Sequence, residues 1–180
     1  MSFRGKQRGY TIAELMIVVA IIGLLVGLAF IFFRPGEDAL ALDRAAQKVA
    51  QDVRSVAQLA LKAESHSCSA GVGGGKTSAY GIIFDKSVKT SYELFADCNA
   101  RGTYSAGNDD IVKTLNIEER NIEISNVEPT NNEWAIFTPP DPVVVFKSVT
   151  SAITITLSTT TSPIQTRNIV IGAKGVVEVQ

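Results

Sequence analysis

Residues 10–33 read YTIAELMIVVAIIGLLVGLAFIFF, an apolar run that contains a single charged residue, Glu14. At about 1.5 Å of rise per residue, a helix of this length extends ~36 Å, enough to cross a hydrocarbon core of roughly 30 Å. An ionised carboxylate in such a segment costs on the order of several kcal/mol, so its presence predicts a function. Upstream, Arg4, Lys6 and Arg8 make the first residues basic. The chain is therefore expected to begin with a basic leader and a membrane-length helix that carries one acid near its start.

The order of these features resembles the N-terminus of type IV prepilins and type II secretion pseudopilins. The match consists of Gly9, Tyr10, Glu14 and the apolar stretch that continues through Gly23. The resemblance implies that a prepilin peptidase removes residues 1–9 by cutting after Gly9, and that the new terminus, Tyr10, is N-methylated. Family members usually have phenylalanine at that terminus. Tyrosine keeps the aromatic ring and adds a hydroxyl.

Glu14 is expected to direct filament assembly. After cleavage, Tyr10 would carry a positive amine in the same apolar layer as this carboxylate. Because a buried charge needs a partner, the amine of a neighbouring subunit is expected to pair with Glu14 and to fix the stagger between subunits. Two interpretations without such a role stay open: an ordinary secretory signal cut before Phe30, and an uncleaved anchor held with its basic end inside.

The apolar helix is expected to break and then to resume as an amphipathic one. Proline lacks a backbone donor and glycine is flexible, so Arg34-Pro35-Gly36 should interrupt it. From Leu42 to Ala60, apolar residues recur every three to four positions, which predicts a helix packed on a sheet. The predicted divisions are a leader at 1–9, a transmembrane or filament-core helix half at 10–33, an amphipathic half at 34–64 and a β-rich head at 65–180.

The head is predicted to consist of antiparallel strands. Segments rich in Val, Ile, Thr and aromatic residues alternate with Gly, Asn, Asp and Pro, without a helical period long enough for parallel crossovers. The predicted strands are 79–85, 91–97, 111–117, 121–127, 133–138, 142–149, 152–159, 165–171 and 175–180. The fold class is therefore α+β, with a long N-terminal helix packed on a C-terminal antiparallel sheet or sandwich.

The head is also similar to minor pseudopilins of the H type and to related minor pilins. The similarity lies in SAYGIIFD at 78–85, SYELFADCN at 91–99 and the closing TRNIVIGAKGVVEV at 166–179, where Gly175 stands between two strands. It implies a structural subunit, minor and close to the filament tip. The alternatives are a major filament-building pilin and a membrane-anchored module that binds DNA or serves adhesion.

The resemblance also implies partners and a location. The partners are prepilin peptidase, other pilins or pseudopilins, an assembly platform membrane protein and, indirectly, an assembly ATPase. The protein is expected in the cytoplasmic membrane as a single-pass protein with its head outside the cytoplasm, and then in a periplasmic or extracellular filament. DNA-binding relatives use an Arg-rich last hairpin, whereas this one offers only Arg167 and Lys174. Without the leader's three basic residues, 14 of the 17 remain against 18 acids, which argues against nucleic-acid binding.

The two cysteines, Cys68 and Cys98, are predicted to form a disulfide. They form no CxxC pair and lie on the translocated side of the membrane, where disulfides persist. Two free buried thiols are the alternative. Pilins often place their disulfide nearer the C-terminus.

No residue set predicts an enzyme or a cofactor. GVGGGKT at 71–77 has the wrong spacing for a phosphate loop, and His66 beside Ser67 lacks the remaining parts of a nucleophilic site. Asp97 and Asn99 resemble the first ligands of a calcium loop, although Arg101 occupies a position that needs another ligand. They are kept as calcium candidates, with an Asx-rich turn as the alternative.

Overall fold

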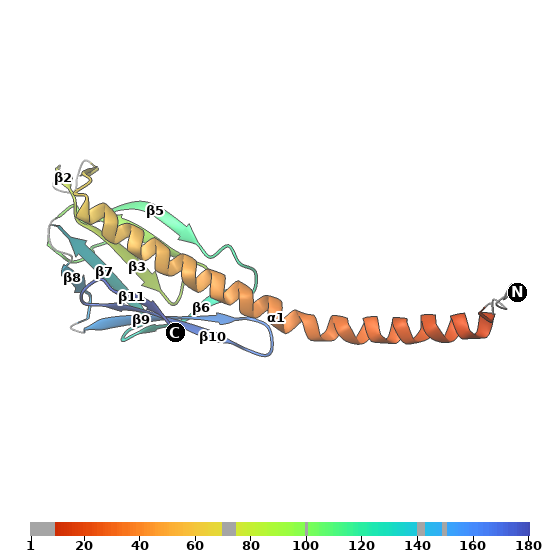
Figure 1. The fold of residues 1–180 in the computed structure, drawn as a ribbon. Helices are drawn as coiled ribbons and strands as arrows, with labels where there is room; N and C mark the ends of the chain where they lie inside the picture. Colours follow the sequence, from red (N-terminus) through yellow and green to blue (C-terminus); the bar gives the residue numbers. More distant parts are fainter. Residues whose placement is uncertain (1–9, 70–74, 100, 140–142, 149–150) are drawn as a thin grey trace, which may run out of the picture. The chain divides into compact units, whose positions relative to one another are not determined.

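A computed structural model describes residues 10–69, 75–99, 101–139, 143–148 and 151–180, with the side chains of residues 30–35 left aside. The chain divides into two compact units, Met1–Glu37 and Asp38–Gln180. The first holds the apolar part of a helix, and the second holds the rest of that helix and the strands (Figure 1).

The helix, α1, extends from Ile12 to Leu61. The prediction of a break at Arg34-Pro35-Gly36 is wrong, because the backbone is helical through these residues. A proline removes a single intrahelical hydrogen bond, and the helical turns on either side keep theirs. The helix closes at Ala63, whose φ of 50° is the left-handed conformation typical of the residue that follows a helix C-cap.

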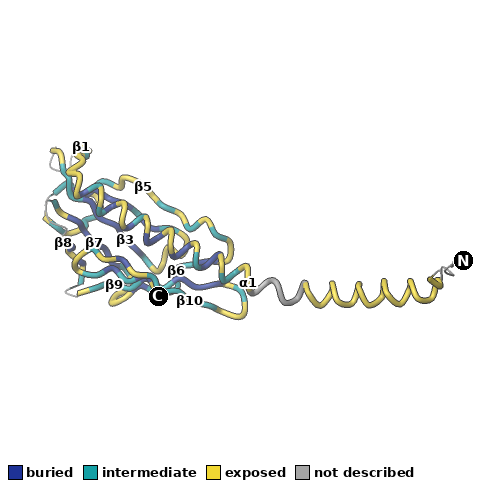
Figure 2. The backbone as a smooth tube through the Cα atoms, viewed as in Figure 1, coloured by how far each residue is buried: buried dark blue, intermediate teal, exposed yellow. Residues whose placement is uncertain are grey.

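The first unit offers an apolar surface that nothing in its own unit covers. Ile12–Ala29 has a mean hydropathy of 2.7 and none of it is buried. Figure 2 shows this part of α1 as exposed throughout. It is the one helix among the described residues that is long and apolar enough to cross a membrane, judged by length and composition.

The strands of the second unit follow the predicted ones closely. They are β1 His66–Ser67, β2 Lys76–Thr77, β3 Tyr80–Asp85, β4 Ser91–Ala96, β5 Asp110–Asn116, β6 Ile122–Glu128, β7 Asn132–Thr138, β8 Val143–Phe146, β9 Ala152–Thr159, β10 Thr166–Gly172 and β11 Val177–Val179. The short pair β1 and β2 was not predicted. Two residues are too few to produce a visible alternation of apolar and polar side chains.

The strands form two main antiparallel sheets, as the sequence predicted. One has the order β5-β4-β3-β7-β8 and the other β11-β10-β9-β6, while β1 and β2 form a separate pair. The first sheet joins strands distant in sequence, since β3 pairs with both β4 and β7. The head is thus an α+β domain in which one helix half and two sheets share a core.

The core of the head is continuous from α1 to both sheets. From α1 it includes Leu42, Val49 and Val53, each at most 2 % exposed. Polar contacts also fasten the helix to the sheets. Among them, Arg167 Nε donates to Asp43 Oδ1 at 2.6 Å, and the Tyr92 hydroxyl donates to Asp52 Oδ2 at 2.7 Å. Burial, followed by this hydrogen bond, raises the pKa of Tyr92 above its ordinary value.

A second, smaller apolar cluster consists of Ile83, Phe95, Trp134 and Ile136. The rings of Phe95 and Tyr104 lie 4.7 Å apart, so the segment between β4 and β5 contributes to this cluster. Gly81 lies opposite Phe95 on the neighbouring strand. A Cβ at Gly81 would overlap the Phe95 ring, which is fully buried.

Gly81→Ala is therefore expected to destabilise the head. Overpacking of a closed core typically costs ~1–3 kcal/mol, which corresponds to a fall in melting temperature of about 2–10 °C. Thermal unfolding followed by circular dichroism measures it. Gly172→Ala is the matched control, because its Cβ would lie 3.7 Å from the nearest atom, an ordinary contact. Equal melting temperatures for the two variants would contradict the prediction.

Candidate functional site

The N-terminus of α1 is closed by a reciprocal pair of contacts between Thr11 and Glu14. The backbone N–H of Glu14 donates to Thr11 Oγ1 at 3.2 Å, and that of Thr11 donates to Glu14 Oε2 at 3.3 Å. This is a capping box, which satisfies backbone donors that a helix start leaves unpaired. The sequence signal was present, since Thr-x-x-Glu precedes an apolar run, but Thr11 was not recognised as a site residue.

The capping box gives Glu14 a local role in addition to the predicted one. Both residues are exposed, and so is Tyr10 at 87 %. The carboxylate therefore holds the helix start and remains accessible to a positive group from outside the chain. Gly9, the predicted cleavage position, lies outside the described residues.

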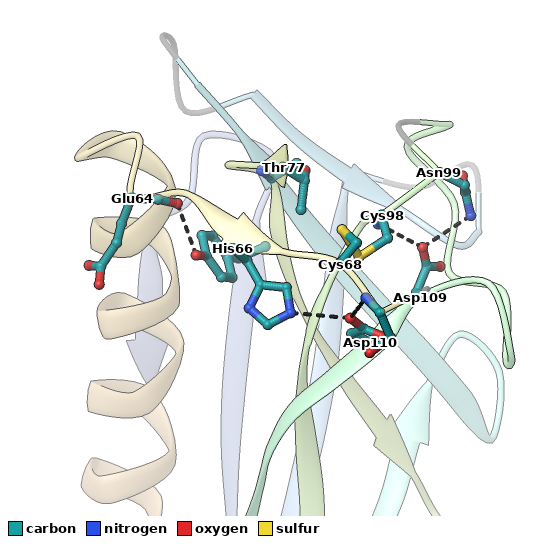
Figure 3. Close-up of a disulfide and its surroundings, with 11 residues drawn as sticks. Glu64, His66, Cys68, Thr77, Cys98, Asn99, Asp109 and Asp110 are labelled. Atoms are coloured by element: carbon teal, nitrogen blue, oxygen red, sulfur yellow. Dashed lines mark hydrogen bonds and ion pairs between the residues drawn. A yellow bond between two sulfur atoms is a disulfide. The ribbon is translucent and has the colours of Figure 1, made fainter. Parts of the chain in front are cut away.

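The predicted disulfide between Cys68 and Cys98 is present, with the two Cα atoms 5.7 Å apart (Figure 3). It joins the segment just after β1 to the segment just after β4. The connection that follows the helix is thus attached covalently to the segment that leaves β4, the second strand of the five-stranded sheet.

Asp110, the first residue of β5, holds the connection after the helix by hydrogen bonds beside the disulfide. Its Oδ2 accepts from the backbone N–H of Ser69 at 2.7 Å and lies 3.3 Å from His66 Nε2. The hydrogen bond from the Ser69 backbone N–H is the main cause that lowers the pKa of Asp110 below its ordinary value. His66, Cys98 and Asp110 come close enough together to suggest a metal site. Cys98 offers no thiolate because it belongs to the disulfide, so this group lacks its third ligand.

Asp97 and Asn99 lie at the start of the segment between β4 and β5, where the structure adds a third residue, Asp109. The oxygen of the Asn99 side chain accepts from the N–H of Arg101 at 3.0 Å, while its amide nitrogen donates to Asp109 Oδ1, also at 3.0 Å. The predicted Asx-type turn is thus present at Asn99. In the sequence, Asp109 stands in the acidic run Asn108-Asp109-Asp110, and its proximity to Asn99 follows from the pairing of β4 with β5.

Comparisons with known proteins bear on both ends of the chain. The family model of the prokaryotic N-terminal methylation motif matches residues 4–30. A crystal structure of the type IV minor pilin FimU from Pseudomonas aeruginosa PAO1 shares the fold at a TM-score of 0.51. The two sequences are 12 % identical over 83 % of this chain and 92 % of the other. The chain has the N-terminal motif and the fold of a type IV pilin. No curated protein matches it.

The structure also accounts for two other sequence features, the GVGGGKT stretch at 71–77 and the basic residues of the last hairpin. Lys76 and Thr77 form β2, and the strand β3 follows instead of the helix that a phosphate loop requires. In the last hairpin, the guanidinium of Arg167 is paired with Asp43. This pairing reduces the positive charge that the hairpin could offer to DNA.

Proposed function

We propose that the protein is a minor, tip-proximal structural subunit of a type IV pilus or type II secretion pseudopilus. The observation that carries the proposal is the uncovered apolar segment Ile12–Ala29, which begins three residues after Gly9, the candidate cleavage position, and lies within the methylation motif. Lipid, or the equivalent helices of other subunits, must cover such a surface. The head supports the minor role by its similarity to minor pseudopilins and by its likeness in fold to a minor pilin.

In this proposal, prepilin peptidase cuts between Gly9 and Tyr10, and Tyr10 is then N-methylated. The basic leader keeps the N-terminus on the cytoplasmic side, and the disulfide is suited to the opposite, oxidising side. The subunit then passes from the cytoplasmic membrane into a filament through an assembly platform protein, with an assembly ATPase as the energy source. Other pilins pack against its apolar helix. The protein has a structural rather than a catalytic role.

Processing is tested by the N-terminal sequence and mass of the protein recovered from native membranes. We expect a chain that begins with N-methylated Tyr10. A Gly9→Leu variant is expected to keep its leader, because the peptidase recognises a small residue before the cut. A start at Phe30 would identify a secretory signal, and retention of residues 1–9 beside an active peptidase would identify a simple anchor. Either result would overturn the proposal.

The minor role is tested by abundance. A tip-proximal subunit is expected to make up a small fraction of sheared filaments, measured by quantitative mass spectrometry against the most abundant pilin of the same preparation. A share equal to that of the main subunit would indicate a filament-building pilin instead.

A further inference from the structure

The disulfide has two potential metal ligands beside it, the imidazole of His66 and the carboxylate of Asp110 (Figure 3). The ligand atoms of His66, Cys98 and Asp110 all lie within 4.8 Å of one another. While the disulfide is intact, its sulfurs are bonded to each other and this group lacks a thiolate. Reduction would supply Cys98 as the missing ligand and, because the two sulfurs are neighbours, Cys68 as a fourth.

Two segments of the head would each contribute a pair of ligands. His66 and Cys68 belong to an extended segment, since β1 pairs with β2 and the backbone N–H of Cys68 continues that pairing by donating to the carbonyl of Gly75 at 3.0 Å. Residues two apart in an extended segment project to the same face. The other pair, Cys98 and Asp110, lies at the end of the ladder between β4 and β5. The fold therefore brings four ligands from two segments to one place.

The spacing of these side chains suits a tetrahedral zinc ion. Nitrogen and oxygen ligands about 2.0 Å from zinc are roughly 3.3 Å apart at the tetrahedral angle. His66 Nε2 and Asp110 Oδ2 are 3.3 Å apart in the structure. Zinc-bound sulfurs are about 2.3 Å from the metal and thus roughly 3.8 Å apart, so the two cysteine side chains must rotate away from each other after reduction. The half-buried position of both cysteines permits this rotation.

We propose that the reduced head binds one zinc ion through the four side chains around this bond: Cys68, Cys98, His66 and Asp110. Thiolates are soft ligands that favour zinc over calcium or magnesium, and four protein ligands are typical of a structural zinc site. Asp110 is already held in place, since its Oδ2 accepts from the backbone N–H of Ser69 at 2.7 Å. Such hydrogen bonds orient a ligating carboxylate toward its metal. The side chains of His66 and Asp110 are 27 % and 16 % exposed, so an ion can enter from solvent.

The site forms in two steps. A dithiol reductant attacks the disulfide by thiol–disulfide exchange, is itself oxidised to a disulfide and leaves Cys68 and Cys98 as thiols. Zinc then displaces the two thiol protons, which pass to water, and binds the resulting thiolates together with the neutral imidazole of His66 and the carboxylate of Asp110. The same two segments are thus joined in the oxidised head and in the zinc-bound one. The inference concerns the head alone and does not depend on the proposed filament role.

The zinc affinity of the full-length protein in detergent tests the proposal. The protein is reduced with a phosphine, which takes up the oxygen of water as it converts the disulfide to two thiols, and zinc is titrated in competition with a chromophoric chelator. We expect one zinc ion per chain with a dissociation constant on the order of 10⁻⁹ M at pH 7. The oxidised protein is the matched control and is expected to bind no zinc at this affinity. Absence of binding by the reduced protein, or equal binding by the oxidised one, would overturn the proposal.

Cobalt(II) in place of zinc reports which ligands are bound. A tetrahedral site with two thiolates is expected to give thiolate-to-cobalt charge-transfer absorption in the near ultraviolet and intense visible d–d bands, because geometry and ligand type decide the spectrum of this ion. Addition of zinc should abolish both, since zinc binds such ligands more tightly. A spectrum without the charge-transfer absorption would show that the cysteines do not bind the metal, and the proposal would be wrong.

Asp110→Asn tests the carboxylate ligand. Its amide oxygen can still accept from Ser69, whereas its zinc affinity should be lower by ~10-fold or more, since loss of even an outer partner of a ligand costs about 10- to 100-fold. Glu64→Gln is the matched control and should bind zinc as the wild type does. Glu64 is exposed and stands two residues before His66, and Figure 3 shows its carboxylate pointing away from the disulfide. Equal affinity of Asp110→Asn and the wild type would contradict the proposal. If Asp110→Asn fails to fold, the comparison of reduced and oxidised wild type decides.

Discussion

Glu14→Gln is expected to remove the protein from filaments while leaving its membrane insertion intact. Glutamine keeps the capping box with Thr11, because its side-chain oxygen accepts the same backbone N–H. It carries no charge, so the amine of Tyr10 on a neighbouring subunit would be buried without a partner. Breaking a buried pair in this way costs ~3–5 kcal/mol, which weakens subunit association by on the order of 10²- to 10⁴-fold. Immunoblots of sheared filaments and of the membrane fraction measure both effects.

Thr11→Ala is the control that separates charge from capping. It removes the cap, at a cost of about 0.5–2 kcal/mol at the helix start, and leaves the carboxylate in place. We expect this variant to enter filaments, with Glu14→Ala failing as Glu14→Gln does. The opposite pattern, in which Glu14→Gln assembles and Thr11→Ala does not, would show that Glu14 acts as a helix cap only.

The strands of the head were predictable because their local patterns are clear: some alternate between buried and exposed side chains, whereas β3 and β7 are short apolar runs that are buried almost throughout. In β9, buried Ile153, Ile155 and Leu157 alternate with half-exposed residues, and the pattern can be read directly from the sequence. The helix was predictable for the same reason, apart from the break at Pro35. Proline was expected to interrupt the helix because it lacks a backbone N–H, but one missing hydrogen bond does not break a helix with many turns on both sides.

The order of strands in the sheets was not predictable from local patterns. Pairing of β3 with β7 joins Ile82 to Ala135, and β6 pairs with β9 across two intervening strands. Such pairings depend on which faces bury each other in the whole domain. The same limit applies to Asp97 and Asp109. The sequence shows them in two nearby polar segments, whereas the contacts of Asp109 with the Cys98 and Asn99 nitrogens follow from the register of β4 and β5.

The N-terminal site shows a different kind of limit. The motif that points to a pilin is local, so Gly9, Tyr10 and Glu14 could be selected from the sequence. What the structure added is a second, purely local reason for an acid at position 14, the contact with Thr11. A resemblance to a family does not separate the charge of Glu14 from its capping contact with Thr11. Glu14→Gln removes the charge and keeps the cap, whereas Glu14→Ala removes both, so the glutamine variant is more informative.

Removal of the disulfide by the double substitution Cys68→Ser and Cys98→Ser is expected to destabilise the head by ~3–4 kcal/mol. The bond closes a loop with a sequence separation of 30, and the chain-entropy model assigns this cost to a loop of that size. Urea unfolding followed by tryptophan fluorescence measures it, because Trp134 is buried beside Phe95. With a slope of about 2 kcal/mol per molar urea, the midpoint should fall by roughly 1.5–2 M.

Reduction of the wild-type protein provides the internal control. The sequence has no cysteine other than this pair, so a reductant should lower the wild-type midpoint toward that of the double variant and leave the variant unchanged. The Ser69 and His66 contacts with Asp110 hold the same segment without the bond, so the head should still fold. A midpoint that falls by less than ~0.5 M would mean that these contacts alone fix the segment, and that the denatured chain gains little freedom when the disulfide is lost.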